Sequence, residues 1–517
     1  MSQIPTSPST PCGAKPWSAK AIPHFVPAES LNIPGDPCID LYYKHFHRHH
    51  PCVLPQTHLE RLLEDSSRQV SLKPLISVMR FVGSLYARLE QGKPLVEDTI
   101  NVCVATEQCS RDPFTVQYRL IYSITLYWCG EHVRSREEMN RAIELALELG
   151  MHRRSFATQH GHGDSVREES WRRTWWQLYI VDSWYAAIKH VRICPTYCVD
   201  VTTELPCEEE EYESGAIPPP KTLEEFDSRE FSAINQVYSS FAYLIGITHD
   251  LYTVMAGLEW DTSNDSASNV AEMIDVVIEG WLLLLPESKR QILSRNGEFD
   301  ELMFQANMAI HALTLSNHRQ FSALALNPVE RISSCLSNAP DNCFCTSVDY
   351  ETIHTARCLQ AIEAQIRLIS LPIRPYAHTP FVICMLATGT ISLLSACKYF
   401  LTGQKLAVAR HQIKMSLGYI KSLSKVWPQA QTTVQEIQTI AREVLEKSSQ
   451  NHPCIPCLDT IPPNCSIQPS LSPGFDVSQD SSACGLAMPF LEILDTEFHL
   501  SDTQADTTWF LADDHES

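Results

Sequence analysis

The chain has 517 residues, 44% of them hydrophobic and 18 of them glycine, which excludes a fibrous or wholly disordered protein and predicts a soluble helical globule. Its 40 Lys and Arg residues stand against 61 Asp and Glu residues, and the resulting net charge of −21 disfavours a surface that grips duplex DNA. The 19 cysteines are scattered through apolar runs, as in proteins of a reducing compartment, and the start lacks the apolar segment of a signal peptide.

Residues 1–36 are rich in proline, serine and threonine, which predicts a disordered lead. Lys15 and Lys20 are its only basic side chains, too few for a stripe that binds phosphates. The cysteines before residue 100 are far apart and form no C-x-x-C pair; they are Cys12, Cys38 and Cys52. Because each zinc ion needs four converging ligands, this region predicts neither a zinc cluster nor a DNA-binding head.

A histidine-rich run, HFHRHH, occupies residues 45–50. His45 and His49 are four residues apart and would share one face of a helix, a spacing that metal sites use. No Cys, Asp or Glu near the run completes a ligand set, so the sequence favours a packing role over a metal site.

Residues 117–188 predict three consecutive helices: an apolar one, an amphipathic one and one rich in tryptophan. Ser135 and Glu138 have the spacing of a capping box, which predicts that the amphipathic helix begins at Ser135. Gly150 stands where a left-handed residue would end it. The third helix carries apolar side chains on two sides over residues 171–185, which predicts a central, buried helix.

Two charged features have local explanations. Arg172 and Arg173 are expected on the helix surface, where they would extend past the tryptophans or pair with Glu168 and Glu169. Residues 207–220 contain four consecutive glutamates and three consecutive prolines, which predict a surface loop because like charges repel and prolines do not continue a helix.

Helical patterns resume at residues 222–327 and again at 348–370, 378–402 and 405–447. The run at residues 381–397 is uncharged, but it is short for a membrane span and contains several hydroxyl side chains, so a buried core helix is favoured. Strand patterns with hairpin turns are lacking, and the predicted fold class is therefore all-α.

The last 67 residues contain eleven acids and no Lys or Arg. Acids alternate with large apolar residues after residue 490, which is typical of activation segments that a partner's groove binds. The candidate anchors are Phe498, Trp509, Phe510 and Leu511. A plain acidic extension and a last helix docked on the body are the alternatives. Cys454 and Cys457 form a lone C-x-x-C pair, too little for a zinc or redox site.

Signatures of catalysis are lacking: the sequence has no Walker A loop, G-x-G-x-x-G, H-E-x-x-H or G-x-S-x-G motif. An enzyme is therefore not expected, and neither are catalytic, cofactor-binding or metal-binding residues.

Several ordered pieces resemble the fungal-specific transcription factor domain, the middle region of fungal zinc-cluster regulators. They are DLYYKHFHRHHPCVLP, GEHVRSREEMNRAIELALELGMHR, ESWRRTWWQLYIVDSWYAA, ELPCEEEEYESG, GWLLLLPESKR and ELMFQANMAIHALTLSNHR. Together they cover residues 37–319, and Gln320 replaces the proline that usually follows the last piece. The resemblance implies a large multi-helix regulatory domain and a packing role for the histidine-rich run.

The implied organisation is a disordered lead at 1–36, the regulatory domain at 37–330, a connector at 331–347, helices of the same body at 348–447, and a tail at 448–517. The tail would be disordered, first Pro/Ser-rich and then acidic and hydrophobic.

The resemblance also implies a nuclear transcription regulator, one that controls a gene cluster for a specialised metabolite or a catabolic pathway. Family regulators bind DNA through six cysteines that hold two zinc ions, so zinc is expected only with such a cluster. The acidic tail is expected to bind the transcription machinery or a coactivator. The chain is also expected to pair with a second copy of itself or with a DNA-binding relative, and no association with a membrane is expected. The alternative is an interaction or ligand-sensing module that modulates a zinc-cluster partner.

Overall fold

The computed structural model describes residues 33–446, apart from 67, 90–92, 95, 99–100, 102–110, 192–193, 233–235, 258–263, 295, 325–326 and 338–347. The residues up to Val444 form one compact unit, and of the second unit only the end of the last helix is described. The expected lead, except its last four residues, and the tail with its candidate anchors lie outside the described residues.

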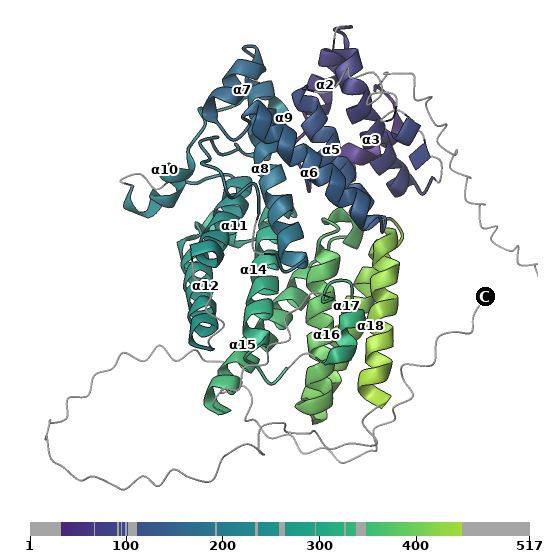
Figure 1. Cartoon of the computed structure of the whole chain (residues 1–517), viewed down its shortest axis with the longest axis vertical. Coiled ribbons are helices and arrows are strands. Elements are labelled where there is room, and N and C mark those ends of the chain that lie inside the picture. The colour runs from purple at the N-terminus through teal and green to yellow at the C-terminus, as the bar shows by residue number, and fades with distance from the viewer. Residues whose placement is uncertain are drawn as a thin grey trace, which may run out of the picture. The chain divides into compact units, whose positions relative to one another are not determined.

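The described residues form helices and two isolated β-bridges but no β-strand, which confirms the all-α prediction (Figure 1). The α-helices are α1 (Pro37–Leu41), α2 (Gln56–Leu63), α3 (Gln69–Ala87), α5 (Pro113–Trp128), α6 (His132–Leu149), α7 (Arg154–Gly161), α8 (Ser165–Ile188), α9 (Glu209–Ser214), α10 (Leu223–Asp227), α11 (Ser240–Gly257), α12 (Asn264–Leu284), α13 (Glu287–Arg290), α14 (Glu301–Arg319), α15 (Val348–Ile369), α16 (Val382–Tyr399), α17 (Gly403–Leu423) and α18 (Pro428–Glu446). A π-helical turn, η1 (Tyr42–His47), and three short 3₁₀ turns, η2 (Arg229–Phe231), η3 (Pro328–Ile332) and η4 (Pro375–Ala377), complete the elements.

The first helices cross at very short range. The carboxylate of Asp36 accepts hydrogen bonds from the first amides of α1, and Arg80 of α3 donates to its other oxygen at 2.6 Å. Gly83 lies against the backbone of Cys38, and a Cβ at Gly83 would be 1.9 Å from the Cys38 carbonyl oxygen. Only glycine at this position permits the close packing of α3 on α1.

Helices α5 and α6 form an antiparallel pair, and the predicted capping box at its turn is wrong. Helix α6 begins at His132, one turn earlier, so Ser135 lies inside the helix. Its hydroxyl donates to the Ser123 carbonyl of α5 at 2.8 Å instead of capping. The predicted end is confirmed, because Gly150 has a φ of +77° in the left-handed region.

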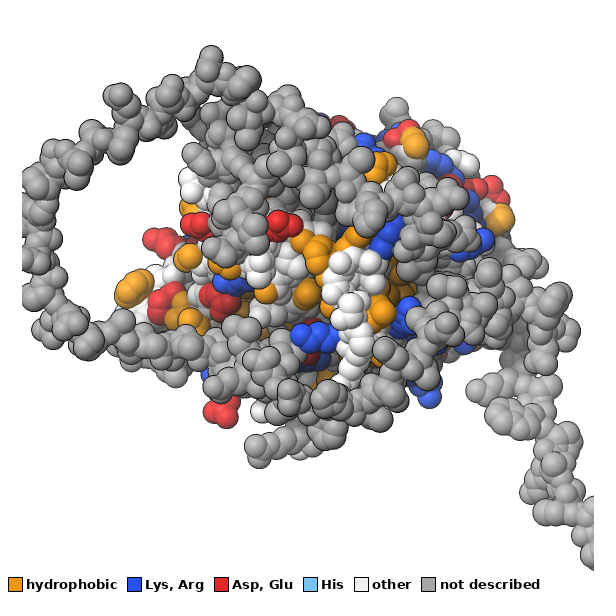
Figure 2. All heavy atoms as spheres, turned by 90° about the horizontal axis from the view of Figure 1, so that it is seen from below, with side chains coloured by type: hydrophobic (Ala, Val, Ile, Leu, Met, Phe, Trp, Pro, Cys, Tyr) orange, Lys and Arg blue, Asp and Glu red, His pale blue; other side chains and the backbone are white. Residues whose placement is uncertain are grey.

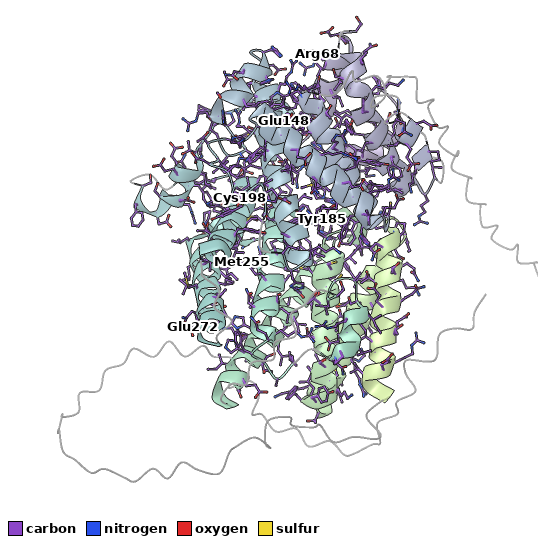
Figure 3. All side chains as sticks on the ribbon, viewed as in Figure 1. Arg68, Glu148, Tyr185, Cys198, Met255 and Glu272 are labelled. Atoms are coloured by element: carbon purple, nitrogen blue, oxygen red, sulfur yellow. The ribbon has the colours of Figure 1, made fainter. Side chains whose placement is uncertain are left out.

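Helix α8 is the central helix, as its two apolar sides predict, and it packs on α5, α6, α7 and α11. Trp175 and Trp176 are fully buried. Near its end, Tyr185 (Figure 3) places its hydroxyl oxygen 3.3 Å from Ser123 Oγ and 3.2 Å from Ser135 Oγ. Polar contacts thus join α8 to both helices of the α5–α6 pair.

Helix α14 is the centre of the second half, where it packs against α11, α12, α15 and α16. Helix α16 is long and apolar enough to cross a membrane, but 67% of it is buried in the fold, which matches the predicted core helix. The pattern at 405–447 forms two helices rather than one, because Pro428 starts α18 at the position where proline is tolerated and ends the continuity with α17.

Figure 2 shows basic side chains among exposed apolar ones on the face seen from below.

Candidate functional site

A charged cleft of about 370 Å³ lies on the outer side of the α5–α6 pair. Its lining alternates arginine and glutamate with one phenol and one amide: Glu97, Asn101, Arg119, Tyr122, Arg134, Glu137, Glu138 and Arg141. Four of these residues, at positions 134, 137, 138 and 141, belong to α6. Residues 137 and 138 follow residue 134 by three and four positions, and residue 141 follows them by four and three, so all four share one face of the helix.

Ion pairs hold the floor of the cleft in place. Arg119 of α5 donates to Glu138 Oε2 at 2.5 Å, and Arg141 donates to the other oxygen of the same carboxylate at 2.7 Å. The Glu138 side chain is largely buried, whereas that of Arg141 is half exposed. A carboxylate shared by two arginines is fixed in position, and it leaves part of each guanidinium free to meet an incoming polar group.

Arg134 forms the rim. It donates to Glu97 Oε1 at 2.8 Å and to the Tyr122 hydroxyl at 3.1 Å. Burial raises the pKa of Tyr122 to about 12, so this phenol stays protonated at neutral pH. The lining supplies charges and hydrogen bonds but no activated nucleophile, and this chemistry suits recognition of a polar or charged group.

The cleft was missed in the sequence, although the stretch that builds it is the most distinctive part of the chain. A usable signal was present, because arginine and glutamate alternate on one face of α6. That pattern is also the ordinary pattern of a solvated helix face, and only the packing of α5 beside it reveals a cleft.

A buried ionic centre lies on α8, apart from the cleft lining. Arg172 and Arg173 are buried rather than on the surface, which corrects the prediction, and both pair with Glu169 as one alternative expected. The Nε atoms of the two arginines lie 2.9 Å and 2.8 Å from the Glu169 oxygens. Burial opposes ionisation of Glu169, but Arg173 and Arg172 outweigh it and lower the pKa of this carboxyl below its usual value.

The predicted surface loop at 207–220 is also corrected, because residues 209–214 form α9 and pack on this centre. Arg173 donates to Glu209 and to the Cys207 carbonyl, the latter at 2.8 Å. Its guanidinium lies 4.0 Å from the centroid of the buried Tyr212 ring. Repulsion among the four glutamates is relieved because Arg173 neutralises Glu209, and Lys289 neutralises Glu208 at 2.6 Å.

The histidine-rich run packs into the core, as predicted. His50 lies 3.1 Å from Gln177 of α8 and 3.3 Å from Thr379, just before α16. The carbonyl of His49 accepts a hydrogen bond from Gln305 of α14 at 3.1 Å. Among the described residues, no three His, Cys, Asp or Glu side chains could hold a metal ion together. The run therefore joins three segments that are far apart in the sequence.

Acidification is expected to destabilise the fold through His49. Burial lowers the pKa of His49 from 6.5 to about 4, so the unfolded chain takes up a proton between these values that the folded chain does not. Stability is therefore lost as the pH falls from 6.5 to 4, by about 2–3 kcal/mol from this residue. Urea unfolding at pH 4.5–7 measures the loss.

The matched variant is His49→Gln, which removes the titrating ring. The slope of unfolding free energy against pH between 4.5 and 6 should then fall by about 1.4 kcal/mol per pH unit, which is the contribution of one proton bound on unfolding. An unchanged slope would show that His49 does not carry this dependence.

The residues predicted to act as activation anchors lie outside the described residues, so the structure neither brings them together nor separates them. They are Phe498, Trp509, Phe510 and Leu511. Cys454 and Cys457 lie outside them as well.

Comparison with known proteins shows which proteins the chain resembles. The chain matches the fungal specific transcription factor domain over residues 39–285. It is 31% identical over 428 residues to a protein described as the C6 finger domain transcription factor iacK of Pestalotiopsis fici (strain W106-1 / CGMCC3.15140); the match covers 82% of this chain and 62% of that protein. No solved structure matches the chain. The matched region extends from within α1 to the end of α12 and contains the charged cleft and the buried ionic centre, and this part of the chain is similar to the fungal specific transcription factor domain.

Proposed function

We propose that this chain is a nuclear transcription regulator that controls a gene cluster for a specialised metabolite or a catabolic pathway. The observation that carries the proposal is the likeness to a C6 finger transcription factor, which covers 82% of the chain and so extends beyond the family domain. In this proposal a C6 finger, the element in that relative's name, makes the contact with DNA.

The helical body acts as the regulatory platform in this proposal. Its charged cleft on α5 and α6 offers fixed arginine and glutamate side chains to a polar effector or to a partner's side chains. The buried pairs around Arg173 hold α8 and α9 in one arrangement.

The acidic C-terminal segment acts as the activator. Its eleven acids keep the apolar side chains soluble, and a coactivator groove would take up Phe498, Trp509, Phe510 and Leu511. The apolar anchors supply the binding energy, whereas each acid contributes a weaker, screened attraction.

Fusion of the full chain to a heterologous DNA-binding domain is expected to activate a reporter gene. Replacing Trp509, Phe510 and Leu511 together with alanine should abolish the output, because the anchors for the coactivator are removed. The matched control, Asp506→Asn, should only weaken it, because one charge among eleven acids is lost. Reporter activity at equal protein level measures both.

A triple variant as active as the parent would contradict the activator role of these residues. A parent fusion that is nuclear and well expressed but inactive would favour the second candidate function, an interaction or ligand-sensing module that modulates a zinc-cluster partner. The charged cleft of about 370 Å³ is the observation that favours this second function.

A further inference from the structure

Helix α12 carries an apolar surface that no described neighbour covers. Met273 and Leu284 are 44% and 45% exposed, and Val276 and Leu283 are each 72% exposed. Gly280 lies between them, and a Cβ built on it meets no atom within 4 Å. These five residues are called the α12 seam; the helix lies on the left side of the lower half of Figure 1, and Glu272 on it is labelled in Figure 3.

The seam lies opposite the buried face of the same helix. Ile274, Ile278 and Trp281 point into the core at no more than 6% exposure. Residues 273, 276, 280 and 283 follow each other at intervals of three, four and three, which is the a/d spacing by which one helix packs along another. A surface helix needs one apolar face, and α12 has two.

We propose that the α12 seam pairs with the seam of a second copy of this chain, antiparallel and around a two-fold axis. In this register Met273 meets Leu283 of the second copy, and Gly280 receives Val276. Large side chains thus meet large ones at the ends, and the gap at Gly280 accepts the valine. A two-fold pairing uses the same patch on both copies, so the surface is self-complementary.

Charge along the seam agrees with this pairing. Glu279 would lie near the Glu279 side chain of the second copy across the two-fold axis. Arg357 of α15 lies 3.5 Å from the Glu279 carboxylate of the same chain and provides the opposite charge. Two arginines and two glutamates would therefore alternate across the axis.

The size of the surface predicts a weak dimer. The seam extends over about 17 Å of helix at 1.5 Å per residue. Ile353 of α15, one turn before Arg357 and 58% exposed, widens the surface beside it. Stable interfaces bury about 800 Å² on each partner, so a patch at the low end of this range should dissociate at roughly micromolar concentration.

Sedimentation equilibrium of the full chain tests the proposal over roughly 1–100 µM, a range set by the expected dissociation constant. The parent should pass from monomer to dimer, and Val276→Lys should raise the dissociation constant at least about tenfold. The matched control is Val133→Lys on α6, because Val133 is also a helical valine and is 75% exposed. It should dimerise like the parent.

Gly280→Leu distinguishes the arrangement. Leucine suits a helix better than glycine, so the monomer should be at least as stable as the parent, while the new side chain would fill the space for Val276 and weaken the dimer about tenfold or more. A tighter dimer with this variant would overturn the antiparallel pairing. A monomer throughout, or equal effects of the two lysine variants, would overturn the seam as the interface. The pairing does not rest on the proposed function, since the reporter fusion measures activation separately.

Discussion

Replacing Arg173 with alanine is expected to lower the free energy of unfolding by about 3–5 kcal/mol, because the buried carboxylate of Glu169 and the part-buried one of Glu209 lose this partner. Arg173 is fully buried and donates hydrogen bonds to Glu169 and Glu209 and to the Cys207 carbonyl. Only Arg172 would remain to balance Glu169. Urea unfolding followed by circular dichroism at 222 nm measures the loss.

Arg141→Ala is the matched control. Arg141 also pairs with a glutamate, at 2.7 Å from Glu138, but its side chain is 53% exposed. An exposed pair of this kind contributes about 0–1 kcal/mol, so the two variants should differ severalfold. Arg173→Lys should recover part of the stability, since it restores the charge but not the planar fork that reaches three groups. Equal losses for Arg173→Ala and Arg141→Ala would show that the buried centre does not hold α9 on α8.

The periodicity of the sequence was sufficient to predict the central helix. Apolar side chains on two sides at residues 171–185 required burial on both sides, and α8 is buried in that way. Gly150 and the uncharged run in α16 were also predictable, because a left-handed end and an apolar core helix each have a local signature. Such features depend on residues within a few turns of each other.

Features that depend on distant partners could not be predicted. In the sequence alone, the glutamates at 208–211 have the pattern of a loop whose charges repel each other. Their partners are distant in the sequence: Arg173 is 36 residues from Glu209, and Lys289 is 81 residues from Glu208. Arg172 and Arg173 were predicted on the surface for the same reason, because the sequence does not show that distant residues pack around them. The capping-box motif at Ser135 failed for a related reason, since the hydroxyl bonds to the Ser123 carbonyl on α5.

The charged cleft shows the same limit. Its lining comes from the apolar helix α5, from the charged face of α6 and from Glu97 and Asn101, and none of these contributions alone indicates a cleft. The prediction of one continuous helical pattern over α17 and α18 was an error of a different kind. Pro428 is visible in the sequence, and it occupies the first position of the new helix.

Truncation of the tryptophan pair in α8 should also cost about 3–5 kcal/mol for each residue changed to alanine, because both indoles are fully buried. Phenylalanine separates the two positions. Trp176 Nε1 donates to the Glu204 carbonyl at 2.9 Å, whereas Trp175 Nε1 makes no hydrogen bond within the described residues. Trp176→Phe therefore loses ring volume and leaves a part-buried carbonyl without that donor.

We expect Trp176→Phe to cost about 0.5–1.5 kcal/mol more than Trp175→Phe, the net contribution of one hydrogen bond. The carbonyl of Glu204 lies in the segment that leads to α9, so the larger loss should coincide with faster hydrogen exchange at residues 205–214. Urea unfolding and amide exchange of the two variants measure both effects. Equal costs, with unchanged exchange in that segment, would mean that packing alone fixes α8 and that the indole hydrogen bond does not hold the acidic segment in place.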